Sequence, residues 1–107
     1  MKYLLLIYRD PASLGVRGLL EELAGSGELV AGAALADPVN TRTFSGRGGV
    51  PATTDRPYAE AGAQLTGYLV VDCEDIDRAS EIAAGVPGTR FTTVEVRPIM
   101  DLSGQEM

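Results

Sequence analysis

An apolar stretch near the start of the chain decides the fold: Lys2-Tyr3-Leu4-Leu5-Leu6-Ile7-Tyr8-Arg9. It is short, contains no glycine or proline, and is apolar at alternate positions in both registers, which is typical of a strand buried on both faces of a sheet. One row consists of Tyr3, Leu5 and Ile7, and the other of Leu4, Leu6 and Tyr8. The fold must therefore cover two apolar faces of this strand.

Farther along the chain, the apolar spacing predicts alternating strands and helices. We expect a first helix with Ser13 as its cap and with Gly25 and Gly27 at its end. A second helix should begin near Asp75, where acidic residues gather. Strands are expected at 28–35, 65–73 and 92–99, and a hairpin pairing 41–45 with 50–54 precedes the strand 65–73. This order predicts an α+β fold, a ferredoxin-like βαββαβ sandwich with an inserted hairpin.

The last strand carries a polar row that indicates its place in the sheet. In a ferredoxin-like topology the first and third main strands are central, and the last strand lies at an edge. Val94 and Val96 alternate there with Glu95 and Arg97, as expected for a strand with one face toward a core and one toward solvent. We therefore expect the strand 92–99 at an edge.

The second apolar row of residues 2–9 predicts a partner. Both helices of such a fold cover the same face of the sheet, so the other face keeps one row of residues 2–9 and one of the two rows of residues 68–71, in which Leu69 and Val71 oppose Tyr68 and Val70. An exposed apolar patch of this size marks an interaction surface. The simplest cover is the same face of a second copy, which predicts a homodimer that forms an α+β barrel. A second interpretation stays open, in which the segment 37–63 folds over the face as a lid.

Composition limits the partners and the location. The 107 residues suit one domain, expected at 1–100 and followed by a short tail at 101–107. A net charge of −6, with Lys2 the only lysine, argues against nucleic-acid and membrane partners. A single cysteine, Cys73, excludes an intrachain disulfide, suits a reducing compartment and, among acidic neighbours, is not expected to be a nucleophile. We therefore expect a cytoplasmic protein.

Acidic clusters in the sequence do not predict a metal site. Glu21, Glu22 and Glu28 form one group, and Asp72, Glu74, Asp75 and Asp77 form another. Neither has the spacing of a cation-binding loop, so both are interpreted as solvated charges at helix ends. We expect no metal and no cofactor.

The candidate chemistry precedes the strand 65–73, in the run Asp55-Arg56-Pro57-Tyr58. Asp55 most often accepts backbone amides in such a turn, but in a cleft a carboxylate of raised pKa acts as a general base. Arg56 would hold an anionic group and Tyr58 would donate a hydrogen bond to a carbonyl or oxyanion. Asp55 and Tyr58 are thus catalytic candidates, and Arg56, Tyr8 and Tyr68 are substrate-binding candidates on the motif and the central strands.

Several stretches, in this order, carry a family resemblance: residues 1–8, Ser26-Gly27-Glu28-Leu29-Val30, Leu35-Ala36-Asp37-Pro38, Thr54-Asp55-Arg56-Pro57-Tyr58-Ala59-Glu60, Gly67-Tyr68 and Val94-Glu95-Val96-Arg97-Pro98. With them the chain resembles the YCII-related family of dimeric α+β barrel proteins, in particular the branch marked by an Asp-Gly-Pro-Phe motif. The resemblance implies a ferredoxin-like protomer, a barrel-forming dimer and a cleft near the motif, without an assigned reaction. Arg56 and Tyr58 replace the motif's glycine and phenylalanine.

Two functions remain open. The resemblance implies a histidine and an aspartate as an acid/base pair, and this chain has no histidine. That loss favours a dimeric YCII-related protein that binds a small anionic or carbonyl-containing ligand or has an accessory role. The alternative is a cofactor-free proton-transfer enzyme, an isomerase, lyase or cyclase, with Asp55 as base and with Arg56 and Tyr58 stabilising negative charge.

Overall fold

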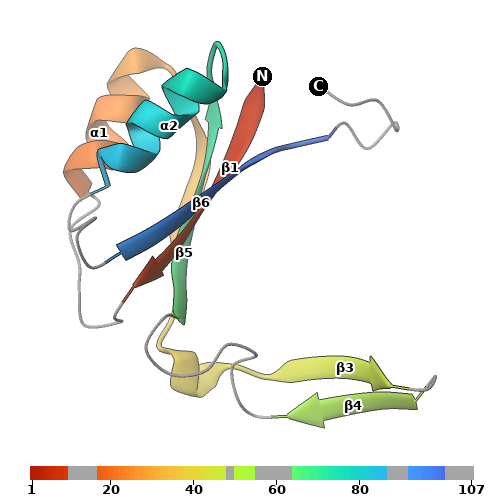
Figure 1. Cartoon of the computed structure of the whole chain (residues 1–107). Coiled ribbons are helices and arrows are strands. Elements are labelled where there is room, and N and C mark those ends of the chain that lie inside the picture. Colours follow the sequence, from red (N-terminus) through yellow and green to blue (C-terminus); the bar gives the residue numbers. More distant parts are fainter. Residues whose placement is uncertain (10–16, 48–49, 55–63, 87–91, 101–107) are drawn as a thin grey trace.

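The computed structural model describes residues 1–9, 17–47, 50–54, 64–86 and 92–100 (Figure 1). The elements, in chain order, are β1 (Lys2–Arg9), α1 (Arg17–Ser26), β2 (Leu29–Ala34), the 3-10 turn η1 (Pro38–Asn40), β3 (Thr43–Arg47), β4 (Val50–Thr54), β5 (Gln64–Asp72), α2 (Ile76–Ala84) and β6 (Thr92–Pro98). This order confirms the predicted α+β fold, a ferredoxin-like βαββαβ arrangement with an inserted hairpin.

The main sheet is antiparallel and has the strand order β2-β5-β1-β6. Leu5 of β1 lies opposite Leu69 of β5 on one side and opposite Val96 of β6 on the other. The first and third main strands are therefore central and β6 is an edge, as predicted. A bulge shifts the β1–β5 register between Ile7 and Tyr8, and such a bulge locally bends and twists the strand.

Both helices lie on one face of the main sheet (Figure 1). The core beneath them is made of Tyr3, Leu5 and Ile7 from β1, Leu69 and Val71 from β5, Leu19 and Leu23 from α1, Ala79 and Ile82 from α2, with Cys73 and Val86. Full burial of an aliphatic side chain such as Leu5 contributes about 1.5–3 kcal/mol. Of the two rows of β1, the helices thus cover the one that begins at Tyr3.

The ends of the helices follow from single residues. Asp75 caps α2, because its Oδ1 accepts the backbone N–H of Arg78 at 2.9 Å. Gly27 follows α1 with φ = +81°, in the left-handed region that glycine enters without steric cost. Gly25 was expected to share in that stop but lies inside α1. The expected cap Ser13 is outside the described residues.

An ion-pair network ties α2 to the junction between α1 and β2. Arg78 donates Nε–H to Glu28 Oε2 at 2.8 Å and Nη2–H to Glu28 Oε1 at 2.7 Å, and it also pairs with Glu81 at 3.1 Å. The interpretation of Glu28 as a solvated charge was therefore wrong. Hydrogen bonds from Arg78 and then Ser26 lower the pKa of Glu28 from 4.5 to about 2.

The hairpin β3–β4 stands apart from the main sheet (Figure 1). Thr43 lies opposite Thr54 and Arg47 opposite Val50, so β3 runs two residues later than predicted. We call the described residues 41–47 and 50–54 the arm. The arm leaves the sheet beside Ala34, which pairs with Gly67 of β5, and it reaches out on the side that the helices do not cover. Its described strands do not lie over the sheet.

Candidate functional site

The face of the main sheet opposite the helices carries the second apolar row. Leu4 lies opposite Val70 and Leu6 opposite Tyr68, so these four side chains share one face with Tyr8. Each of them is only partly buried. We call this surface, with the residues that β2 and β6 add to it, the open face.

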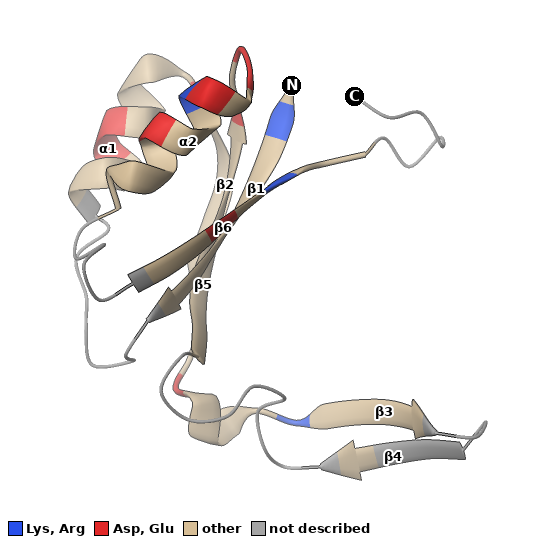
Figure 2. Cartoon of the chain, viewed as in Figure 1, with Lys and Arg blue, Asp and Glu red and all other residues tan. Residues whose placement is uncertain are grey.

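The two outer strands complete the open face differently. On β2, Ala31 and Ala33 lie opposite Val70 and Tyr68 and add small apolar side chains. On β6, the residues that share the face are polar: Thr93 opposite Tyr8, Glu95 opposite Leu6 and Arg97 opposite Leu4. Figure 2 shows the acidic and the basic position along β6. The open face is thus apolar in its middle and charged along one edge.

Tyr8 and Glu95 lie diagonally across β1 and β6 on this face, and we call them the Tyr8–Glu95 pair. The bond to the Glu95 carboxylate is the main cause of a raised pKa of Tyr8, followed by burial of the phenol. A neutral phenol next to a carboxylate donates its proton in the hydrogen bond, which leaves the Tyr8 oxygen free to accept one. Arg97 lies two residues from Glu95 on the same strand and weakly opposes the shift.

This arrangement suits binding of a small polar molecule. The aliphatic floor of Leu4, Leu6 and Val70 supplies contact area, as in most ligand sites. Arg97 supplies donors for an anionic or carbonyl oxygen, whereas the Tyr8 oxygen and Glu95 accept. Tyr68 adds a second phenol on the neighbouring central strand. The polar groups are few and the charged ones lie along one edge, so they would orient a ligand.

The structure brings together only part of the predicted site. Tyr8 and Tyr68 lie on one face of neighbouring strands, as expected for the sheet-face candidates. Asp55, Arg56 and Tyr58 lie outside the described residues. Glu95 was not predicted as a site residue. The signal was the alternation along β6, because residues that alternate with the partly buried Val94 and Val96 must share a face with Tyr8.

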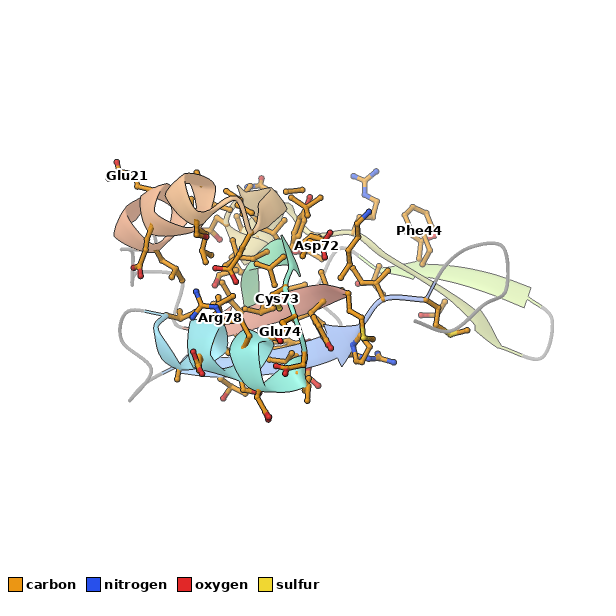
Figure 3. All side chains as sticks on the ribbon, turned by 90° about the horizontal axis from the view of Figure 1, so that it is seen from above. Glu21, Phe44, Asp72, Cys73, Glu74 and Arg78 are labelled. Atoms are coloured by element: carbon orange, nitrogen blue, oxygen red, sulfur yellow. The ribbon has the colours of Figure 1, made fainter. Side chains whose placement is uncertain are left out.

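Cys73 contributes to packing. It is buried at the end of β5, and its Sγ lies 3.6 Å from the carbonyl oxygen of Asp75. Figure 3 shows it beneath α2, near Glu74 and Arg78. Burial raises the pKa of the Cys73 thiol. A protonated, buried thiol is a poor nucleophile, in line with the sequence interpretation.

Within residues 1–9, 17–47, 50–54, 64–86 and 92–100, no group of three or more cysteine, aspartate or glutamate side chains is placed to hold a metal ion. In the same ranges, no helix has the length and apolar character needed to cross a membrane.

Comparison with known families adds the identity of the domain. The model of the YCII-related domain matches residues 1–103, which is nearly the whole chain. The chain belongs to the YCII-related family. A search among curated proteins gave no match. For a YCII-related domain, the open face with Tyr8 and Glu95 is the described surface on which a site is best sought, since the other face is filled by the helices.

Proposed function

We propose that this YCII-related protein is a homodimer that binds a small molecule on the open face, as a binding or accessory protein. The observation that carries the proposal is the Tyr8–Glu95 pair beside a floor of partly buried aliphatic side chains. Burying these two polar side chains under a purely apolar surface would cost free energy, because their polar atoms would lose hydrogen bonds to water. The pair is therefore suited to a ligand or a partner with polar groups.

The dimer is supported by the apolar floor itself. Leu4, Leu6 and Val70 sit on the two central strands, where no other element of the described chain covers them. Covering such area is favourable by about 25 cal/mol per Å², before the costs of association. When a second copy packs with the same face, the apolar side chains of both copies are buried in one interface.

The ligand that fits is small and anionic or carbonyl-containing. Arg97 supplies a fixed positive charge with several donors. Arg56, in the run before β5, is a second candidate cation, and Asp55 and Tyr58 are candidates for further polar contacts. The Tyr8 hydroxyl stays protonated beside Glu95, and its oxygen would accept from a hydroxyl or amide of the same ligand. No cofactor is needed for binding of this kind.

The proposal is tested with a panel of small carboxylic acids and ketones on the full chain. We expect some of them to raise the thermal unfolding midpoint, and we expect Tyr8→Phe and Arg97→Gln to abolish that rise. Glu74→Gln is the matched control, since Glu74 is exposed next to α2 on the far side of the sheet. If the rise persists in both variants, the ligand site is elsewhere and the proposal fails.

A further inference from the structure

The arm carries an exposed aromatic residue near its base. Phe44 on β3 is 71% exposed, and Val39 on the turn leading to the arm is 78% exposed. Figure 3 shows Phe44 on the side of the molecule away from the helices. The arm consists of two strands of five residues each, and an isolated two-stranded hairpin is marginally stable in water. It therefore needs a surface to pack against.

Charge indicates what that surface is. The arm holds two of the nine basic residues of the chain, Arg42 and Arg47, and none of its fifteen acidic residues. All fifteen acidic residues lie elsewhere in the chain, and its net charge is −6. A basic segment on an acidic protein is complementary to another copy of that protein, and complementary charge steers such encounters.

The direction of the arm fits the same partner. It reaches out on the side of the open face, so a second copy seated on that face would lie beside it (Figure 1). A standard interface buries about 800 Å² of accessible surface on each partner. Contact between the arm and the second copy would add to the area that the open face buries.

We propose that the arm of each protomer docks on the second copy and places Phe44 against its partner. This inference rests on the proposed homodimer and assigns part of its interface to residues 41–47 and 50–54. The dimer then has two contact areas of different kinds. One is the apolar floor of the open face, and the other is a basic, aromatic arm on an acidic partner.

A photo-crosslinker tests the contact directly. Benzoylphenylalanine in place of Phe44 in the full chain should give a covalent dimer on irradiation. A mixture of light and isotope-labelled chains should give mixed crosslinked peptides, which proves that the bond joins two copies. The same group in place of Ile76, an exposed apolar residue at the start of α2, is the matched control and should give no dimer. Crosslinks confined to one chain would overturn the proposal in favour of a lid.

A dissociation constant gives the second readout. Phe44→Ser should raise the dimer dissociation constant at least tenfold by analytical ultracentrifugation, while Ile76→Ser should leave it unchanged. A dimer that Phe44→Ser leaves intact, without crosslinks between chains, would overturn the arm and leave the homodimer standing. A wild-type chain that is monomeric at every concentration would overturn both. Circular dichroism of each variant confirms that the main sheet is retained.

Discussion

The two faces of β1 carry nearly the same residues but have different surroundings. Tyr3, Leu5 and Ile7 are at most 3% exposed beneath the helices. Leu4, Leu6 and Tyr8, built from the same residue types, remain partly exposed. Residue type therefore predicts that burial of either row is favourable, but it does not say which element packs against each row.

The two tyrosines extend this comparison to chemistry. The pKa of Tyr3 is raised first by burial, whereas the pKa of Tyr8 is raised first by its hydrogen bond to Glu95. Tyr3 thus serves as a large core side chain with its hydroxyl at the rim, near Met1. Tyr8 serves as one half of a polar pair. Substitutions on either face should therefore have different effects.

The largest effect separates Leu5 from Leu6. Leu5→Asp buries a charge beneath the helices and should cost about 4 kcal/mol or more, close to the whole stability of a small domain. Leu6→Asp places the charge on the open face and should leave a folded monomer. Circular dichroism and light scattering distinguish the two results. If Leu6→Asp remains a dimer, the open face is not the interface.

The next effect concerns the network that fastens α2. The folded-state pKa of Glu28, about 2, lies below its ordinary 4.5. Its contribution to stability is therefore fully present above about pH 4.5 and is lost as the pH falls toward 2. Glu28→Gln should be less stable than wild type at neutral pH, and the difference should shrink over that acid range in urea unfolding. Glu22→Gln, on the exposed side of α1, should show no such convergence.

A smaller effect is expected at Cys73, on the helix-covered side. Cys73→Ala removes one buried sulfur and should cost about 1 kcal/mol in urea unfolding. Because the thiol belongs to the core, ligand binding and dimer mass should be unchanged. A folded Cys73→Ala protein that no longer binds its ligand would reopen a role for the thiol.

The smallest stability effect is expected at Tyr8, on the open face. Tyr8→Phe removes one hydrogen bond and should cost about 1 kcal/mol or less. Glu95→Gln should lower the pKa of Tyr8, because the charged acceptor is its main cause, and should leave that of Tyr3 raised. NMR titration of ring-labelled tyrosine measures both groups in one sample. Equal pKa values of Tyr8 in wild type and variant would contradict the hydrogen bond.

Local patterns in the sequence predicted most of the fold. The alternation in residues 2–9 predicted a central strand, the spacing around Asp75 predicted a capped helix, and the period of two in β6 predicted an edge strand. Each of these signals lies within a few residues of chain. Helix length was less well predicted, because Gly25 is tolerated inside α1 and only Gly27 takes the left-handed conformation.

Contacts between distant residues were not predictable in the same way. Glu28 and Arg78 are fifty residues apart, and nothing in either neighbourhood marks the other as a partner. Tyr8 and Glu95 could have been paired from the predicted topology, but this needs the register of β1 against β6. The candidates Asp55, Arg56 and Tyr58 lie outside the described residues and remain predictions.

The pairing of Ala34 with Gly67 gives the arm a modular character. The chain leaves β2 and returns to β5 at the same end of two neighbouring strands. The inserted segment is therefore connected to the main sheet at one place only. Each doubling of the length of such an insertion costs only about 0.6 kcal/mol of closure entropy. The segment can therefore lengthen, shorten or change its tip while the registers of the main sheet stay as they are. Partner choice and core stability can thus diverge independently among related chains.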